Sequence, residues 1–322
     1  MAQMPKWYQE IGPLLPQRAR MALLACEHTN LQLVTEIRLR ANRPFMLQLG
    51  VEDRFVSAAG ALQKTPEDPL IIHPEEIRRS FEAICQHSIY AFENEIRNGF
   101  VTLRGGYRVG IAGRVNAQNG QVLSIPHCAG LCIRMMREIQ GCADPLMEHI
   151  TRENEVLATL IVSPPMMGKT TILRDIARQL SNGVFGAQGK RVCVVDERAE
   201  IAGAVNGVAQ LDVGLRTDVL DACPKAKGMM MALRSLSPEV LITDELGSEE
   251  DANAVLEAAF AGVKVIASAH GQDQKDVWNR KGLALLMEQK AFARILILGG
   301  KAGQLLKVLD EQGRTLWVRP VS

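Results

Sequence analysis

The amino-acid sequence predicts an α/β protein with two domains, a smaller N-terminal α+β domain over residues 1–150 and a domain with a parallel sheet over residues 151–322. Two patterns support this prediction. From about residue 153 onward, nearly continuous apolar runs alternate with stretches of helical periodicity. Before that point, the strand-like segments are short and are separated by turns. Unbroken apolar runs are typical of strands that helices cover on both faces of a parallel sheet.

The C-terminal half contains five such apolar runs, and we expect each of them to form a buried strand. The stretches between them suit right-handed crossover helices, which join parallel strands. The change of pattern places the domain boundary near residues 145–155, after Asp144-Pro145. The expected strands span residues 156–162, 191–197, 239–245, 264–270 and 293–299.

The N-terminal half mixes two predicted helices with short strand-like segments. Apolar spacing predicts helices over residues 17–28 and 75–86. Gly105-Gly106 and Asn119-Gly120 mark turns. The expected strands are TEIRLR, FMLQLG, GFVTLR, YRVGIAGRV and GLCIRMM.

Composition excludes several classes of protein. Of the 322 residues, 47% are hydrophobic and 23% are charged, a balance typical of a folded globular chain. The net charge of +1 provides no general attraction to nucleic acid or to an anionic membrane. The chain has no signal-peptide pattern at its start and no apolar run of about 18 residues, so we expect a cytoplasmic protein without membrane insertion. Seven cysteines without a CxxC pair argue against a zinc ribbon.

A long segment of the N-terminal half carries only positive charge. No acidic residue lies between Glu95 and Glu138. The segment forms either a basic surface or a surface that binds an anion, either nucleotide or nucleic acid, because arginine binds phosphate through two hydrogen bonds. Its arginines are Arg97, Arg104, Arg108, Arg114, Arg134 and Arg137.

A candidate phosphate-binding loop follows the first expected strand of the C-terminal half. Backbone amides of such a loop, and of the helix after it, point toward phosphate oxygens. Lys169 is expected to contact the β- and γ-phosphates, and Thr170 to bind Mg²⁺. Ser163 and Met166 stand where many such loops have glycine. The loop and helix start comprise Ser163, Pro164, Pro165, Met166, Met167, Gly168, Lys169, Thr170 and Thr171.

Charged residues end three other expected strands, at the sheet edge where α/β proteins bind ligands. Asp244 is expected to bind the metal with its water shell, and Glu245 to orient the attacking water. The alternative is an exposed acidic pair. Glu197 is a second candidate for the catalytic carboxylate. His270 is either a sensor of the γ-phosphate or a structural histidine. Strand, loop, GKTT and helix with acidic strand ends together predict a RecA-like P-loop ATPase that uses ATP and Mg²⁺.

The sequence also indicates roles for two further arginines and the start of one helix. Arg216 and Arg234 are either fingers that act on a neighbouring subunit or surface charges. Ser248 and Asp251 have the spacing of a capping box for the helix that follows Glu245.

Several segments in one order resemble the stage III sporulation protein AA family, which is related to the traffic ATPases of type II and type IV secretion. The resemblance covers roughly residues 30–300. The segments are TEIRLRANRPF, GGYRVGIAGR, CIRMMREIQG, PPMMGKTTILRDIAR, VVDERAEIAG, GLRTDVLDACPKAKGMMMALRSLSPEVLITDELG and ASAHG.

The resemblance implies further properties. It implies a Walker A loop at residues 163–171, an acidic box at residues 196–198, a Walker B motif that ends at Asp244 and Glu245, and a histidine box at His270. It also implies hexameric rings, with nucleotide between the two domains and Arg134 and Arg137, or Arg108 and Arg114, near the phosphates. The family functions in endospore formation. Its expected partners are membrane channel proteins between mother cell and forespore, reached from the cytoplasmic side.

Three functional hypotheses follow from the sequence. The first is an ATP-hydrolysing motor for secretion or channel assembly during sporulation. The second is a motor that moves nucleic acid, which is less favoured because the arginine segment has few stacking aromatics beyond Phe100 and Tyr107. The third is a nucleotide-binding scaffold whose altered loop no longer supports turnover.

Overall fold

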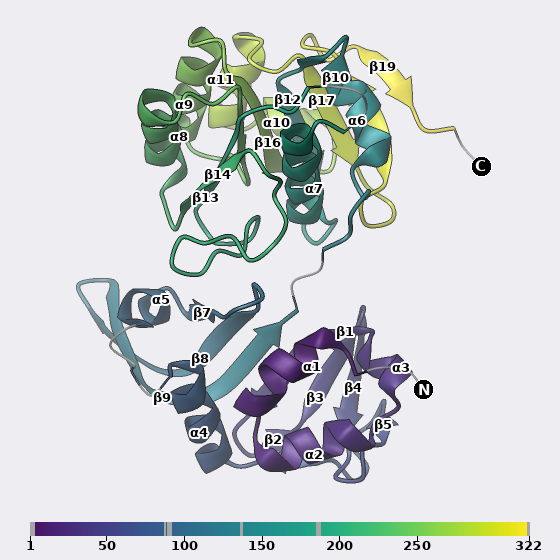
Figure 1. The fold of residues 1–322 in the computed structure, drawn as a ribbon, viewed down its shortest axis with the longest axis vertical. Helices are drawn as coiled ribbons and strands as arrows, with labels where there is room; N and C mark the ends of the chain where they lie inside the picture. Colours follow the sequence, from purple (N-terminus) through teal and green to yellow (C-terminus); the bar gives the residue numbers. More distant parts are fainter. Residues whose placement is uncertain (1–3, 87, 89–91, 136–137, 185–187, 321–322) are drawn as a thin grey trace. The chain divides into compact units, whose positions relative to one another are not determined.

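The chain folds into two compact units, residues 1–136 and residues 137–322, here called the N-terminal and C-terminal units. The computed structural model describes all residues except 1–3, 87, 89–91, 136–137, 185–187 and 321–322 (Figure 1). The expected boundary at residue 150 coincides with the end of helix α6 (Asp144–Ile150). Leu146, Met147 and Ile150 of this helix are buried in a core of the C-terminal unit, which is why residues 137–150 belong to that unit.

The N-terminal unit is built on an antiparallel sheet with strand order β5-β4-β3-β1-β9-β8-β7. Its strands are β1 (Val34–Arg40), β3 (Met46–Leu49), β4 (Glu52–Val56), β5 (Leu62–Gln63), β7 (Phe100–Thr102), β8 (Arg108–Gln118) and β9 (Gln121–Arg134). A small pair is formed by β2 (Arg43–Pro44) and β6 (Ile71–Ile72). The helices are α1 (Lys6–Ile11), η1 (Gly12–Leu14), α2 (Gln17–Ala25), α3 (His28–Leu31), α4 (Pro74–Ile84) and α5 (Glu93–Arg97).

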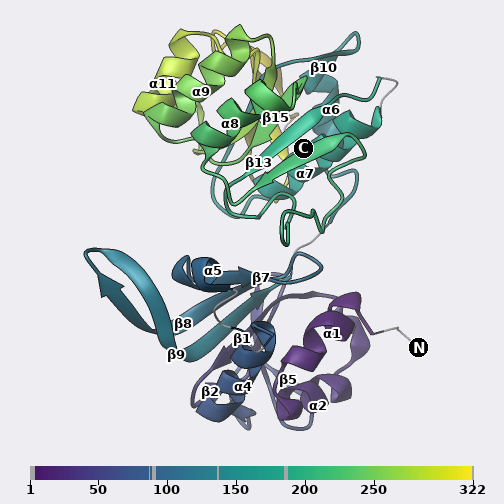
Figure 2. The same ribbon diagram turned by 60° about the vertical axis from the view of Figure 1, so that its left-hand side comes forward.

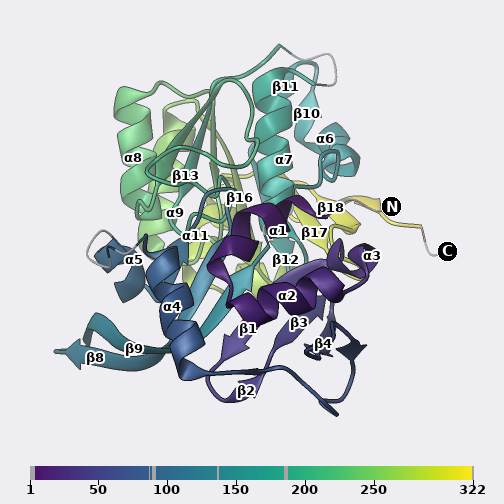
Figure 3. The ribbon, with the colours of Figure 1, turned by 60° about the horizontal axis from the view of Figure 1, so that its bottom comes forward.

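Helices α1, α2 and α4 cover one face of this sheet (Figure 3). Ile37 and Leu39 of β1 point into the core below these helices, while Arg38 and Arg40 alternate to the other face. Strands β8 and β9 continue beyond the rest of the sheet as a two-stranded arm (Figure 2). Residues 112–121 of the arm are all exposed.

The C-terminal unit contains a parallel sheet, as predicted, with strand order β14-β13-β15-β16-β12-β17 followed by antiparallel β18 and β19. The strands are β12 (Thr159–Ser163), β13 (Val192–Asp196), β14 (Thr217–Asp221), β15 (Val240–Thr243), β16 (Lys264–His270), β17 (Arg294–Leu298), β18 (Leu305–Leu309) and β19 (Thr315–Val318). A separate hairpin pairs β10 (Thr151–Arg152) with β11 (Glu155–Val156).

Helices cover both faces of the parallel sheet, as the unbroken apolar runs predict. They are α7 (Lys169–Asn182), α8 (Lys225–Ser235), α9 (Glu249–Phe260), α10 (Gln274–Trp278) and α11 (Lys281–Glu288), together with α6. Val192 and Val194 of β13 face the core that includes α6 and α7. Cys193 and Val195, which alternate with them, face the core that includes α8, α9 and α11.

Local signals explain where several elements begin and end. The capping box at α9 is confirmed, since Ser248 Oγ accepts the Asp251 amide at 3.0 Å and Asp251 Oδ2 accepts the Ser248 amide at 3.1 Å. Helix α7 ends at Gly183, whose φ of 75° allows its amide to bind the Gln179 carbonyl. Among the described helices, none combines the length and the apolarity that a membrane span needs.

Candidate nucleotide-binding site

The predicted phosphate loop connects β12 to α7 at the carboxyl end of the parallel sheet. Strand β12 is buried and lies between β16 and β17, so the loop leaves the middle of the sheet. Gly168 directly precedes α7 as its N-cap residue and has φ of 81°, a left-handed conformation that glycine adopts without strain. No side chain caps this helix and its first turn has no acidic residue. The first amides of the helix are therefore suited to an anion.

Lys169 is held inside the loop rather than extended into solvent. Its side chain is buried, and Nζ donates to Ser163 O at 3.1 Å, Ser163 Oγ at 3.2 Å and Pro164 O at 3.1 Å. Burial lowers the pKa of Lys169, although Glu245 and Asp244 act in the opposite direction. The charges of Glu245 and Asp244 therefore act on the lysine of the loop.

The two departures from a glycine-rich loop have different structural consequences. Ser163 is fully buried, and its hydroxyl contacts Lys169 and donates to Pro164 O at 2.9 Å. Met166 has φ of 62° and an exposed fraction of 89%, so its side chain points into solvent. Met166 therefore imposes backbone strain, while Ser163 adds a contact to the lysine.

Asp244 is a buried carboxylate without a hydrogen-bond partner among the described residues. It is 2% exposed, and neither oxygen accepts a hydrogen bond. Burial, with repulsion from Asp196, raises the pKa of Asp244 to about 7, although Lys225 acts to lower it. A buried polar group without a partner fits a place for a cation or its water ligands.

The donors available for a metal at this site are few. Within the described parts of the chain, no group of three or more His, Cys, Asp or Glu side chains could hold a metal by itself. Mg²⁺ usually binds through one or two protein ligands together with substrate phosphates. The predicted donors Thr170 and Asp244 therefore fit Mg²⁺ that arrives with a nucleotide.

His270 connects the loop lysine to Glu245. Its Nδ1 lies 3.1 Å from Lys169 Nζ, and its Nε2 lies 2.8 Å from Glu245 Oε1. Because an ammonium group only donates, Nδ1 accepts, and Nε2 carries the proton that it donates to Glu245. The other carboxylate oxygen of Glu245 accepts from Arg198 Nη1 at 2.8 Å. Burial raises the pKa of Glu245, but the His270 hydrogen bond and the charge of Arg198 outweigh this, so the pKa is lowered.

The acidic pair at the end of β13, Asp196 and Glu197, consists of one structural residue and one partly exposed residue. Asp196 is fully buried and accepts the amides of Glu200, Ile201 and Ala202 at 2.8, 3.0 and 2.8 Å. Burial is the main reason that the pKa of Asp196 is raised. Glu197, the alternative catalytic carboxylate, forms an ion pair with Lys225 at the start of α8.

Two basic residues were not identified in the sequence as parts of this region. Arg174 of α7 is 4% exposed and donates to the carbonyls of Glu200 and Ile201. It therefore fastens the loop after β13 to helix α7. Lys225 is also buried and contacts Glu197. The available signal for Arg174 was a charged residue among the apolar positions of the helix ILRDIARQL.

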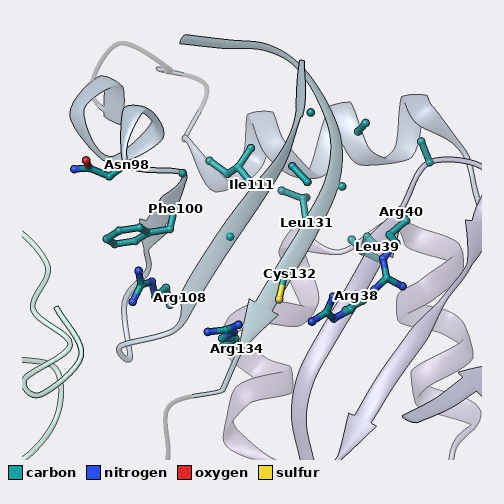
Figure 4. A pocket seen from close by; sticks show the side chains of 17 residues that line it. Arg38, Leu39, Arg40, Asn98, Phe100, Arg108, Ile111, Leu131, Cys132 and Arg134 are labelled. Carbon is teal, nitrogen blue, oxygen red and sulfur yellow. The ribbon is translucent and has the colours of Figure 1, made fainter. Parts of the chain in front are cut away.

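Arg134 lies at the end of β9 in the N-terminal unit (Figure 4). Its Nε donates to Glu36 Oε2 at 3.2 Å, and Glu36 also contacts Arg38. Arg137 lies outside the described residues. The cavity next to Arg134 has a volume of about 590 Å³ and is lined by Arg38, Arg40, Arg108 and Arg134. Arg108 stacks on Phe100, 3.7 Å from the ring centre.

The strand order and the phosphate loop define the fold of the RecA-like P-loop ATPases. The structure is similar to that of the ATPase DotB of Legionella pneumophila, with a TM-score of 0.57 and 15% identity over 92% of this chain and 81% of DotB. It is also similar to the pilus retraction motor PilT with bound ADP, with a TM-score of 0.55 and 15% identity over 91% of this chain and 82% of PilT. At this identity the likeness concerns the fold alone.

The chain belongs to the family of sporulation stage III protein AA. The family model matches residues 6–316. The Stage III sporulation protein AA of Bacillus subtilis (strain 168) is 42% identical over 309 residues, which cover 95% of this chain and 96% of that protein. The resemblance inferred from the sequence segments is thereby confirmed.

Proposed function

We propose that this protein binds ATP with Mg²⁺ at the loop of residues 163–171 and hydrolyses it to drive channel assembly or transport in endospore formation. The observation that carries the proposal is the contact of Lys169 with His270 and of His270 with Glu245, next to the buried carboxylate of Asp244. This arrangement places a cation, a neutral imidazole and two carboxylates at the end of a phosphate loop. The two proteins of similar fold described above are named as an ATPase and as a pilus retraction motor.

Each residue has a role in the proposed reaction. The loop amides and Lys169 bind the β- and γ-phosphates, and Thr170 and Asp244 hold Mg²⁺, which neutralises phosphate charge. Glu245 orients the attacking water, and Glu197 is the alternative carboxylate. His270 holds Glu245 in place, and it senses the γ-phosphate indirectly, through Lys169, whose ammonium group donates to Nδ1. Catalysis then rests on positioning and charge stabilisation without a covalent intermediate.

The proposal extends to assembly and location. We infer a hexamer in which Arg134 and Arg137 contact phosphates, and binding to membrane channel proteins from the cytoplasmic face of the mother-cell membrane. The charge of Arg134, which is 62% exposed at its side chain, supports this assignment. Light scattering of the full chain with and without ATP tests the oligomer, and Arg134→Ala should lower turnover only under conditions where the oligomer forms.

The central experiment measures binding and turnover separately. Lys169→Ala should abolish calorimetric binding of ATP and ADP with magnesium. Glu245→Gln should bind ATP normally and lower the rate of phosphate release by about 100-fold or more, because the water is no longer positioned. Lys264→Ala is the matched control, since Lys264 is exposed at the opposite end of the strand that carries His270.

Two results would contradict the proposal. Absence of nucleotide binding by well-folded wild type would exclude a nucleotide site. If wild type binds nucleotide but releases phosphate no faster than Glu245→Gln, under conditions that form the oligomer, the protein is instead a nucleotide-binding scaffold. If wild type turns over and Glu245→Gln equals it, the catalytic role moves to Glu197.

The arginine-lined cavity of the N-terminal unit is the observation that favours a second function, the handling of nucleic acid. Its four arginines provide the charge that phosphate backbones bind, but Phe100 is the one aromatic side chain among its lining residues. Filter binding of single-stranded DNA and RNA over a salt series tests this function. Tight binding that weakens steeply with salt would favour it.

A further inference from the structure

The backbone of Glu245 is fixed to the neighbouring strand. Glu245 has φ of 44°, in the left-handed region that is uncommon for a residue other than glycine. Its amide donates to Ser268 Oγ at 3.0 Å, and the next amide, of Leu246, donates to Ser268 O at 2.8 Å. The main chain at the end of β15 is therefore held by β16. The side chain of Glu245 needs restraints of its own.

The carboxylate of Glu245 is held from both sides. His270 on β16 occupies Oε1, and Arg198 in the loop after β13 occupies Oε2, both at 2.8 Å. In the sheet, β15 lies between β13 and β16, so the two contacts come from the two neighbouring strands. Removing either contact leaves the carboxylate with one restraint, about which it can reorient.

The loop that carries Arg198 is itself anchored. The Asp196 carboxylate accepts the amides of residues 200–202, and Arg174 donates to the carbonyls of residues 200 and 201. The side chain of Arg198 is 51% exposed, and ion pairs with this exposure add little to stability. The contact of Arg198 with Glu245 is thus better suited to orientation than to stabilisation of the fold.

We propose that Arg198 is a positioning residue of the ATPase reaction, which keeps the Glu245 carboxylate in one orientation toward the attacking water. This inference rests on the proposed function. Arg198 acts through Glu245, as the third group that orients a catalytic base does in other enzymes. It has no part in binding the nucleotide.

Steady-state hydrolysis by the full chain tests this role. Arg198→Ala should lower kcat on the order of 10- to 100-fold, because a misplaced catalytic group loses rate, while KM and ADP affinity stay unchanged. Arg198→Lys should recover part of the loss, because an ammonium group can still donate to Oε2. Arg191→Ala is the control. Arg191 directly precedes β13, at the end of the strand away from Arg198, and 65% of its side chain is exposed.

A double variant separates an action through Glu245 from a direct one. In the Glu245→Gln background, Arg198→Ala should cause no further loss of kcat. An equal loss in both backgrounds, or a rise in KM without a fall in kcat, would overturn the assignment and indicate contact with the nucleotide. Arg198→Gln, which keeps a donor amide, replaces Arg198→Ala if thermal melting shows that the alanine variant does not fold.

The outcomes distinguish this inference from the function on which it rests. If wild type does not release phosphate, both the ATPase proposal and the role of Arg198 are wrong. If wild type turns over and Arg198→Ala keeps the same kcat, the ATPase proposal stands and only the role of Arg198 is wrong.

Discussion

Replacing Asp244 with asparagine should stabilise the protein in metal-free buffer at alkaline pH and should remove the stabilisation by magnesium nucleotide. Asp244 is 2% exposed, its oxygens have no partner among the described residues, and its pKa is raised from 3.8 to about 7, first of all by burial. Asparagine resembles the protonated form in size and charge but cannot ionise.

The sign of the pH effect follows from the two states of the chain. In the unfolded chain Asp244 loses its proton near pH 4, whereas in the folded protein it keeps the proton until about pH 7. Stability of the wild type therefore falls as pH rises between these values, by about 1.4 kcal/mol per pH unit. The total is at most about 4 kcal/mol, because relaxation and entry of water reduce the cost of a buried charge.

The advantage of Asp244→Asn should therefore grow by up to about 3 kcal/mol between pH 5 and pH 8. Scanning calorimetry in EDTA measures this, and for a unit of this size each kcal/mol corresponds to roughly 2–4 °C in Tm. With excess MgADP, wild type should gain Tm and the variant should not. Asp218→Asn, at an exposed position on β14, is the control. An advantage that does not change with pH would refute the reasoning.

Three further substitutions test packing around the site. Arg174→Met should lower the free energy of unfolding by about 1–3 kcal/mol for each of the two carbonyls that lose their donor. Urea denaturation measures this, and a decrease below about 1 kcal/mol would contradict the prediction. Met166→Gly should relieve on the order of 1 kcal/mol of left-handed strain without weakening ADP binding in calorimetry; weaker binding would show that the side chain helps to form the site. Gly228→Ala should lower Tm by an amount that corresponds to about 1–3 kcal/mol, because its Cβ would lie 2.4 Å from Val195 Cγ1. An unchanged Tm would mean that α8 can shift away from β13.

The parallel strands of the C-terminal unit could be predicted because burial on both faces leaves a clear mark in the sequence. Strand β14 was missed, since it lies at the edge of the sheet and its short sequence TDVLD has neither an unbroken apolar run nor a regular alternation. Strands β18 and β19 were also missed, because they extend the sheet in the antiparallel direction after the repeating pattern has ended.

In the N-terminal unit, residues 130–134 of the segment predicted as GLCIRMM form the end of a longer strand, β9. The first residues of β9 belong to the arm, in which residues 112–121 are all exposed, so no core requires a strand pattern there. Helices α1, α3 and α5 are too short for a periodic signal.

Motif spacing located the candidate site residues but not their individual surroundings. Strand ends bring Lys169, Glu245 and His270 to one edge of the sheet, which the order of strands and motifs could predict. The two acidic pairs look equivalent in the sequence, but Asp196 is used by backbone amides while Asp244 has no such partner. This difference depends on the path of the loop after each strand, for which the sequence has no simple signal.

The position of β12 in the sheet has a consequence for how the phosphate loop forms during folding. Both edges of β12 pair with strands that begin about a hundred residues later or more, β16 at Lys264 and β17 at Arg294. The loop also depends on a bond from the Gly303 amide to the Met167 carbonyl at 2.9 Å. A peptide that spans the motif alone, or a nascent chain that ends before residue 303, contains the residues proposed to bind phosphate but lacks the long-range pairings that give the loop its shape.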